Sequence, residues 1–239
     1  MPGSAIVVGV GASAGLGGAL CRRFAREGLQ VVAAGRTAAK LEALAAEIRG
    51  AGGVLVPVVA DTTRADQVAR VFDAAGAPPR IVAFNAGNNR MRPLLEMDDA
   101  FFEDTWRLCC FGGFLVGREA ARRMLPAGGG TLAFTGATAS LRARPPFTAF
   151  ASAKAALRAL AHGMAREFGP QGLHVAHVVI DGGIDGDQLN SRFPQFKQAR
   201  GEDGMLSPDA IADAFWALHV QHRSAWTLEL DLRPYKESF

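Results

Sequence analysis

Cysteine, tyrosine and lysine are all scarce in this chain of 239 residues. The three cysteines, Cys21, Cys109 and Cys110, form no Cys-x-x-Cys pair, which argues against a disulfide-stabilised protein. A sparse and odd number of cysteines is typical of a reducing compartment, so we expect a cytoplasmic protein. The single tyrosine, Tyr235, lies near the end of the chain, where we expect it to be exposed, although such a tail could also reach a cleft.

Long apolar runs and runs of one charge are also missing. No segment approaches the roughly 20 apolar residues that cross a membrane, and the N-terminal segment lacks the basic leader of a signal peptide. The net charge of +3 comes from scattered arginines, which does not indicate a nucleic-acid or membrane surface. His162, His174 and His177 are not spaced as metal ligands. We therefore expect a small-molecule substrate and no nucleic-acid, membrane or metal partner.

Apolar segments and helical patterns alternate along the chain, and hydrophobic residues make up 49% of it, which is enough for one large core. The apolar segments are short and rich in valine and isoleucine, as strands buried on both faces of a parallel sheet must be. The sequence thus predicts an α/β fold, a single Rossmann domain over residues 1–239, with a doubly wound parallel sheet of seven strands and helices on both faces. The predicted strands are residues 5–10, 30–34, 54–59, 80–84, 131–135, 174–180 and 226–232.

Helices with an apolar stripe of period 3.6 are predicted between these strands. The last helix should begin at Ser207 and Pro208, which are typical of a helix cap and of the first helical position. Its predicted apolar face is Ile211, Ala214, Phe215 and Leu218. The other stripes are Leu41, Leu44, Ala45 and Ile48; Val68, Val71, Phe72 and Ala75; and Leu157, Leu160, Ala161, Met164 and Phe168.

A glycine-rich turn, "GVGASAGLGGAL", joins the first predicted strand to the first helix. Gly11, Gly15 and Gly17 are spaced Gly-x-x-x-Gly-x-Gly, and glycine lets the backbone turn tightly and approach a pyrophosphate. The free amides of the helix N-terminus can then meet the negative charge of that group. The position of the turn therefore favours a dinucleotide site over a turn without a ligand.

The end of the second predicted strand indicates which dinucleotide binds. Proteins of this fold that prefer NAD place an acidic residue here, on the ribose 2′-hydroxyl. This chain has no acid in the stretch "VVAAGRTAAK" and has Arg36 there instead, with Lys40 one turn further. An arginine suits a 2′-phosphate through charge-assisted hydrogen bonds, although it could also be a solvated residue at a helix start. We therefore expect NADP(H).

With these residues in place, the chain resembles the short-chain dehydrogenase/reductase family over nearly its whole length. The segments "VGASAGLG", "ADTT", "FNAG", "FASAK" and "IDGGIDG" occur in the order of that family's motifs and at matching intervals. The resemblance implies that Asp61 contacts the adenine and that Lys154 holds the nicotinamide ribose. The cofactor-binding residues that it implies are Gly11, Ser13, Gly15, Leu16, Gly17, Arg36, Asp61, Thr62, Asn85, Ala86, Gly87, Lys154, Gly182 and Ile184.

The catalytic positions of the family are mostly replaced. An asparagine, a serine, a tyrosine and a lysine do the chemistry there: tyrosine exchanges a proton with the substrate oxygen, serine polarises that oxygen, lysine lowers the tyrosine pKa and asparagine supports a water relay. The resemblance puts Phe150 at the tyrosine position, Ala137 at the serine position and Cys109 at the asparagine position. Only Lys154, one of four lysines in the chain, is retained.

Two polar residues close to the missing serine are candidates for part of the lost chemistry. Thr138 could donate a hydrogen bond to a substrate oxygen, or it could bond to the backbone of its own turn. Asp181 follows the sixth predicted strand, and burial there would raise its pKa and make it a proton carrier. The alternative is that Asp181 caps the following turn. For Cys109 a buried, inert thiol is favoured over a nucleophile.

The sequence thus predicts an NADP(H)-dependent oxidoreductase with an altered active site, which reduces a carbonyl or an activated double bond. The alternative is a non-catalytic NADP(H)-binding protein such as a redox sensor, and a third option is an isomerase or lyase. Residues 187–206 fall where the family builds its substrate lid, and Phe193 and Phe196 either line a pocket or pack the lid onto the body. By resemblance we expect a homodimer or homotetramer that associates through the helix containing Lys154 and the helix before it.

Overall fold

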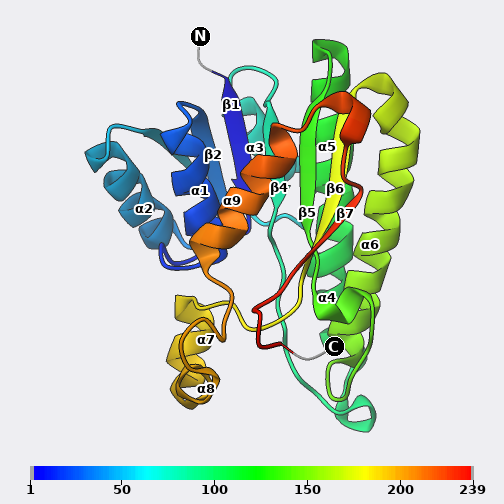
Figure 1. Ribbon diagram of the computed structural model, residues 1–239. Helices are drawn as coiled ribbons and strands as arrows, with labels where there is room; N and C mark the ends of the chain where they lie inside the picture. The colour runs from blue at the N-terminus through cyan, green and yellow to red at the C-terminus, as the bar shows by residue number, and fades with distance from the viewer. Residues whose placement is uncertain (1–2, 238–239) are drawn as a thin grey trace.

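A parallel sheet with helices on both faces forms the centre of the molecule (Figure 1), and the computed structural model describes residues 3–237 of it. The sheet has seven strands in the order β3-β2-β1-β4-β5-β6-β7, and every pair of neighbours is parallel. The predicted α/β Rossmann fold is confirmed; residues 1, 2, 238 and 239 of the predicted domain lie outside the described part. The strands are β1 (Ser4–Val8), β2 (Gln30–Gly35), β3 (Val54–Val59), β4 (Ile81–Phe84), β5 (Gly130–Thr135), β6 (Leu173–Ile180) and β7 (Glu229–Leu232).

The last strand begins later than the sequence predicted. Strand β7 starts at Glu229, whereas the apolar pattern favoured a start at residue 226. The Trp226 ring stacks on His174, with ring centroids 4.8 Å apart and planes 3° from parallel. This side-chain contact places residue 226 beside β6 without extending the hydrogen-bonded ladder.

Side chains alternate between the two faces of the sheet and fill two separate cores. In β1, Ala5 and Val7 belong to one core, and Ile6 and Val8 belong to the other. Helices α1 (Leu16–Arg26), α2 (Ala38–Gly50) and α9 (Pro208–His219) cover the first core. Helices α3 (Ala65–Asp73), α5 (Gly112–Met124) and α6 (Thr148–Phe168) cover the second. The remaining helices are α4 (Asp99–Trp106), α7 (Asp187–Arg192) and α8 (Pro194–Arg200).

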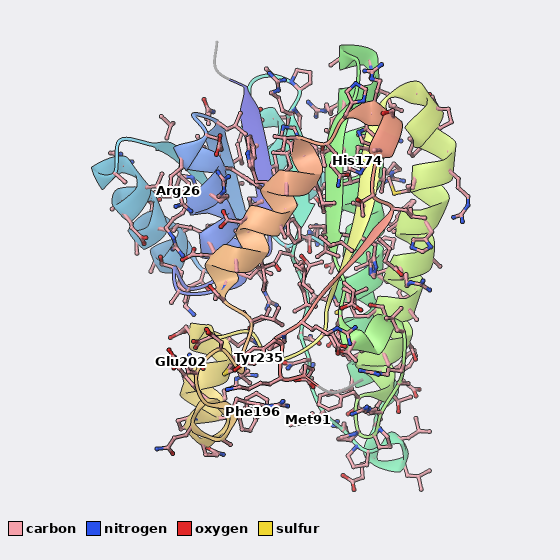
Figure 2. The ribbon with its side chains drawn as sticks, viewed as in Figure 1. Arg26, Met91, His174, Phe196, Glu202 and Tyr235 are labelled. Atoms are coloured by element: carbon pink, nitrogen blue, oxygen red, sulfur yellow. The ribbon has the colours of Figure 1, made fainter. Side chains whose placement is uncertain are left out.

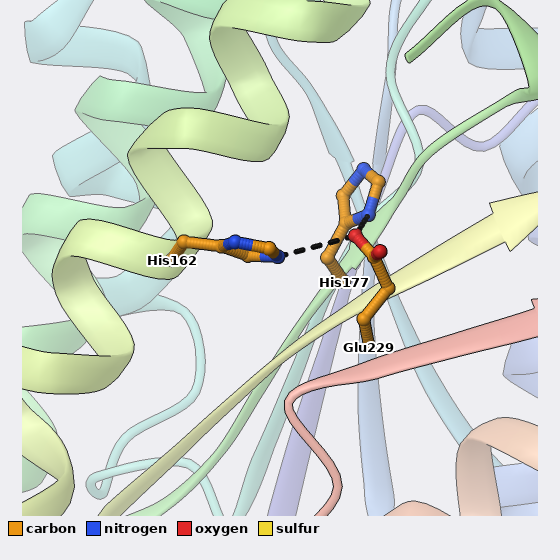
Figure 3. Close-up of side chains that lie close together, drawn as sticks. All are labelled: His162, His177 and Glu229. Atoms are coloured by element: carbon orange, nitrogen blue, oxygen red, sulfur yellow. Dashed lines mark hydrogen bonds and ion pairs between the residues drawn. The ribbon is translucent and has the colours of Figure 1, made fainter. Parts of the chain in front are cut away.

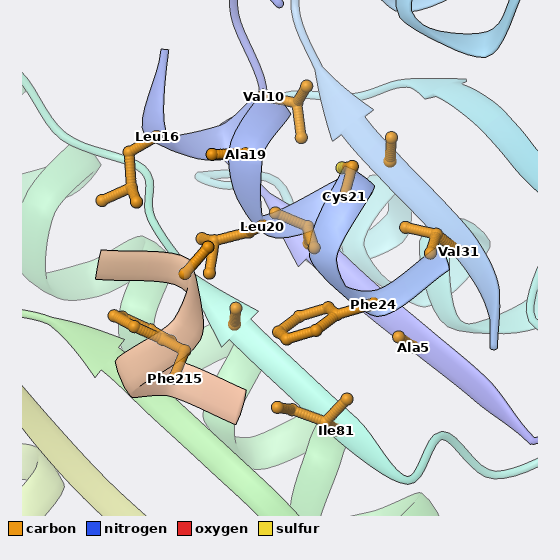
Figure 4. Packing of buried hydrophobic residues seen from close by; sticks show 14 of the residues in the cluster. Ala5, Val10, Leu16, Ala19, Leu20, Cys21, Phe24, Val31, Ile81 and Phe215 are labelled. Carbon is orange, nitrogen blue, oxygen red and sulfur yellow. The ribbon is translucent and has the colours of Figure 1, made fainter. Parts of the chain in front are cut away.

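The predicted start of the last long helix is confirmed. Ser207 caps α9 by accepting a hydrogen bond from the Ala210 amide, and Pro208 is the first helical residue. The buried face includes Ala212, which the sequence analysis did not assign, while Ala214 is only partly buried. Figure 4 shows how Phe215 of α9 approaches Leu20 and Phe24 of α1, which places these two helices side by side on the first core.

The strand order reverses direction beside β1, which pairs with β2 on one side and with β4 on the other. In doubly wound sheets this switch point opens a crevice outside the carboxyl ends of the strands. The loops that follow β1, β4, β5 and β6 all begin at this edge, which places the expected site there. Within the described residues, no helix combines the length and apolar character that crossing a membrane requires.

His219 near the end of α9 makes stability depend on pH. Its Nδ1 lies 2.9 Å from Thr131 Oγ1, and burial, followed by the charges of Arg80 and His174, lowers its pKa to about 4. An unfolded chain therefore binds a proton at this histidine below about pH 6.5 that the folded chain does not bind until about pH 4. The free energy of unfolding should fall as pH falls through this window, by up to about 1.4 kcal/mol per pH unit.

We expect His219→Gln to flatten that slope by about one proton. Urea unfolding at several pH values between about 7 and 4.5 measures it. The exposed His222 provides the matched control, His222→Gln, which should leave the slope unchanged. Identical profiles for the wild type and His219→Gln would contradict the assignment.

Candidate active site

The turn after β1 brings the backbone of two strands into close contact. Gly9 has φ +83°, and a Cβ there would lie 2.4 Å from the Ala86 amide nitrogen, so only glycine fits. A Cβ at Gly17 would lie 2.9 Å from Val10 Cα, which lets α1 pack closely on the end of β1. In contrast, a Cβ at Gly11 would meet nothing within 4 Å. Gly11 therefore faces open space suited to a ligand, whereas Gly9, which the sequence analysis missed, is required by the fold itself.

The N-terminus of α1 has no side-chain partner. Its cap is Gly15, which offers no side-chain hydrogen bond, and the first turn, beginning at Leu16, contains no acid. The amides of this turn carry the positive end of the helix dipole, which favours an anion. Ser13, also predicted to bind cofactor, directs its hydroxyl to Glu47 and accepts a hydrogen bond from Arg22 at 2.9 Å. The Ser13 side chain thus holds the turn onto α1 and α2.

Charged side chains lie where β2 and β3 end. Arg36 follows β2 and is exposed, and Asp61 follows β3. Burial acts to raise the pKa of Asp61, but two hydrogen bonds from Thr63 and the nearby Arg36 and Arg64 together hold it below its usual value. The Thr62 side chain instead points inward, 3.0 Å from a Cβ built on Gly112, so only its backbone can meet a ligand.

The loop after β4 lies over the buried lysine. Asn85 ties this loop to the first turn, because its Nδ2 donates to Gly9 O at 3.2 Å. A Cβ built on Gly87 would lie 3.4 Å from Lys154 Nζ and 3.6 Å from Cys109 Sγ. Three sequence-predicted positions, Gly87, Cys109 and Lys154, therefore meet at one point, although they lie on three different elements.

Lys154 is buried, with 4% of its surface exposed. Its Nζ donates to Thr135 O at 2.7 Å, which joins α6 to the end of β5. Burial lowers the pKa of Lys154, and the Cys109 thiol partly opposes this shift. The Nζ lies 5.8 Å from the centre of the Phe150 ring, so the two side chains share a face of α6, as their spacing predicted.

Cys109 lies in a π-helical turn, Arg107–Phe111, that separates α4 from α5. Its thiol is fully buried and lies 3.9 Å from Asn88 O. A π turn is a common local feature of functional sites, and the sequence analysis did not predict this one. The wider turn directs the thiol toward the loop that contains Gly87.

Ala137 and Thr138 follow β5, and Thr138 bonds across to the end of β6. Its hydroxyl donates to Asp181 Oδ1 at 2.5 Å. Asp181 is 5% exposed, and its Oδ2 also lies 3.3 Å from both Arg142 and Arg233. These contacts tie the end of β6 to Arg142 and to Arg233 of the C-terminal tail. The sequence offered no signal for these partners, which are far along the chain.

The segment after β6 passes between the first turn and the C-terminal tail. A Cβ on Gly182 would lie 2.9 Å from Pro234 of the tail, and one on Gly186 would lie 3.2 Å from Ala14 O. Ile184 forms an isolated bridge with Leu206. Gly186 therefore lies beside the glycine turn, and Gly182 and Ile184, both predicted to bind cofactor, lie in the same segment against Pro234 and Leu206.

The tail also holds the helices of residues 187–206. Arg200 pairs with Glu237 at 2.9 Å, and Lys236 Nζ donates to Glu202 O at 3.0 Å. Figure 2 shows Phe196, Glu202 and Tyr235 at the end of the molecule where the strands terminate. Tyr235 is 76% exposed, in agreement with the expectation for this residue.

Comparison with known proteins assigns the family. Residues 5–195 match the sequence model of the protein family described as short chain dehydrogenase. The chain belongs to the short chain dehydrogenase family. It is therefore an oxidoreductase by family, and its seven-stranded sheet is the family's fold.

The similar proteins include enzymes and a protein named for binding. The crystal structure of a short-chain dehydrogenase from Rhodopseudomonas palustris is 41% identical, with a TM-score of 0.82, and the match covers 97% of this chain and 99% of that one. The A-factor type gamma-butyrolactone 1′-reductase of Streptomyces virginiae is 33% identical over 85% of this chain and 84% of its own. The cyclic-di-GMP-binding biofilm dispersal mediator protein of Escherichia coli is 32% identical over 77% of this chain and 75% of its own.

Substitution by alanine should affect stability differently at Gly9 and Gly11 of the first turn. Gly9→Ala forces a side chain into a positive-φ position against backbone atoms, so we expect a loss of about 2 kcal/mol or more in the free energy of unfolding. Gly11→Ala enters open space and should change stability by no more than about 0.5 kcal/mol. Urea unfolding of both variants beside the wild type tests the contrast, and equal stabilities of the two variants would refute it.

Proposed function

We propose that this short chain dehydrogenase is an NADP(H)-dependent oxidoreductase with an altered active site, acting on a small molecule that carries a carbonyl or an activated double bond. The observation that supports this most strongly is the buried Lys154. An ammonium group in the interior costs free energy unless it is paired or hydrogen-bonded. Lys154 has three donors, and the structure gives one of them an acceptor, Thr135 O. A ribose lying over Gly87 offers hydroxyl oxygens for the others.

The proposed dinucleotide follows the carboxyl edge of the sheet. The open turn at Gly11 and the uncapped amides after Gly15 suit a pyrophosphate. Arg36 and the absence of an acid at the end of β2 favour a 2′-phosphate over a free 2′-hydroxyl. Asp61 remains an anion beside Arg36, which leaves it an acceptor for an amino group of the base.

The bound nicotinamide supplies a hydride in such chemistry, and the chain must manage the proton. In this proposal Phe150 and Ala137 stand at the tyrosine and serine positions, and neither side chain can donate a proton. A positioned acid or base contributes about 10²–10⁴-fold to a rate, so its loss restricts the substrate. Lys154 is the remaining donor in the cluster, and its lowered pKa makes proton release easier than from an ordinary lysine. Reduction of an activated double bond gives an anion that can take its proton from water, so this reaction needs the least proton donation from the protein.

The remaining parts of the proposal concern the lid and the assembly. Residues 187–206 are proposed to form the substrate lid, and Phe196 packs against Gly183, where a Cβ would lie 2.7 Å from its ring. We propose a homodimer or homotetramer formed through α5 and α6. An apolar groove between these helices supports this; its lining includes the partly exposed Phe114, with Leu160, Met164 and Phe168.

A second candidate function is binding of a nucleotide without redox turnover. Replacement of three of the four catalytic positions favours it, and so does the similarity to a protein named for binding cyclic-di-GMP rather than for a reaction. The two candidates differ in whether NADPH is consumed. Measurement of NADPH consumption by the wild type and by a Phe150→Tyr variant, which carries a phenol at residue 150, therefore separates them.

We expect Arg36→Ala to weaken NADPH binding by about tenfold or more and to leave NADH binding within about twofold, because only NADPH carries the 2′-phosphate. Isothermal titration calorimetry measures both affinities. Arg64→Ala removes a neighbouring exposed arginine and is the matched control. Equal losses for the two nucleotides would remove Arg36 from the proposed role, and wild-type protein that binds neither would end the proposal.

Phe150→Tyr should raise NADPH-dependent reduction of a panel of ketones and enones by about tenfold or more, because the new hydroxyl supplies a proton donor on the face of α6 that Lys154 shares. Lys154→Ala should abolish turnover in both backgrounds. NADPH absorbance follows the reaction, and calorimetry checks that cofactor still binds. NADPH binding without turnover by the wild type and by Phe150→Tyr would favour the second candidate.

A further inference from the structure

A second polar cluster lies away from the carboxyl edge, on the face of the sheet that α6 covers. His162 projects from α6, His177 from β6 and Glu229 from β7, and Figure 3 shows the three side chains converging. Glu229 Oε2 lies 3.1 Å from His162 Nε2 and 3.0 Å from His177 Nδ1. The three atoms all lie within 4.8 Å of one another. Packing of α6 against β6 thus unites two histidines whose sequence spacing gave no metal motif.

The spacing of these atoms fits a small tetrahedral ion. Zinc binds histidine nitrogen and carboxylate oxygen at about 2.0–2.1 Å, which places neighbouring ligand atoms about 3.3–3.4 Å apart. The two nitrogen–oxygen distances therefore need to lengthen by a few tenths of an ångström, and the two nitrogens, which lie within 4.8 Å of each other, need to reach this same separation. Two imidazoles and one carboxylate are also a ligand set that zinc accepts with water in the fourth position.

Two of the three side chains are suited to an ion near neutral pH. Burial lowers the pKa of His177 to about 4, against the opposing charge of Glu229, so its imidazole is neutral. In the hydrogen bond to the Glu229 carboxylate the proton is on Nδ1, and an ion at Nδ1 requires this proton to move to Nε2. Hydrogen bonds from Arg158 hold the pKa of Glu229 at about 2. His162 and Glu229 are partly exposed, with side-chain exposures of 19% and 25%, which gives an ion a path from solvent.

Two further features affect whether an ion can bind among these three side chains. His177 is fully buried, and its Nε2 has no hydrogen-bond partner among the described residues. That atom faces Gly136, where a Cβ would lie 2.3 Å away, so the ring is held with Nδ1 toward Glu229. Arg158 opposes a cation, because its Nε donates to Glu229 Oε2 at 2.6 Å. Its Nη2 bonds the other oxygen at 2.8 Å, and the side chain is 36% exposed, so it can release Oε2 and keep Oε1.

We propose that His162, His177 and Glu229 form a binding site for one divalent transition-metal ion of the zinc type, with water as the fourth ligand. An ion there would join α6 to the edge strand β7 through side chains of three elements. Arg158 would act as a competing internal cation that limits affinity while keeping the carboxylate oriented.

Zinc ion alone, added to chelator-treated full-length protein, is the probe. Calorimetry should show one saturable site, and thermal unfolding should shift upward with zinc. His162→Ala and Glu229→Gln should each weaken binding about tenfold or more, whereas His222→Ala, on an exposed histidine, should not. Arg158→Gln should strengthen binding, because a neighbouring positive charge is removed.

Cobalt(II) provides a readout that does not depend on the stability of the variants. Bound at this site, it should give the intense visible absorption of four-coordinate cobalt, and His162→Ala should remove it. No saturable zinc binding by the wild type would overturn the proposal. Binding that His162→Ala and Glu229→Gln leave unchanged would place the ion elsewhere and also overturn it. Weaker binding by Arg158→Gln would contradict the competing role of Arg158.

Discussion

The hydrogen bond from Lys154 Nζ to Thr135 O is the interaction on which the arrangement of the candidate site depends. It fixes the first turns of α6 to the end of β5 and holds a positive charge inside the protein. This hydrogen bond also sets which groups surround the charge. A Cβ built on Gly87 would contact both the ammonium group and the buried thiol of Cys109, so the absence of a side chain there keeps the loop close to both groups.

Much of the fold could be predicted because it depends on local patterns. Short apolar segments with glycine or helical patterns between them were enough to locate all seven strands, since a strand buried on both faces has few polar positions. The start of β7 was missed because Trp226 is held by a side-chain contact with His174, and periodicity does not report contacts between distant residues. The same holds for Ala212, whose burial depends on where α1 lies.

The predictions for the candidate site also divide into those that rest on local signals and those that need contacts between distant residues. Gly11, Gly15 and Gly17 were predicted because their spacing at the end of a strand is a local signal. Gly9 was missed because its requirement comes from Ala86, in the loop after β4. The partners of Asp181 and the meeting of His162, His177 and Glu229 are contacts between distant segments, and a single sequence does not encode them in any spacing.

The C-terminal tail constrains the position of α8. Arg200 at the end of α8 is paired with Glu237, and Lys236 is bonded to the Glu202 carbonyl just beyond this helix, so the tail and α8 are joined at two points. A movement of α8 away from the tail would break both contacts. Because the Arg200–Glu237 pair is partly exposed, dissolved salt screens it. Higher ionic strength should therefore loosen the attachment of α8 to the tail.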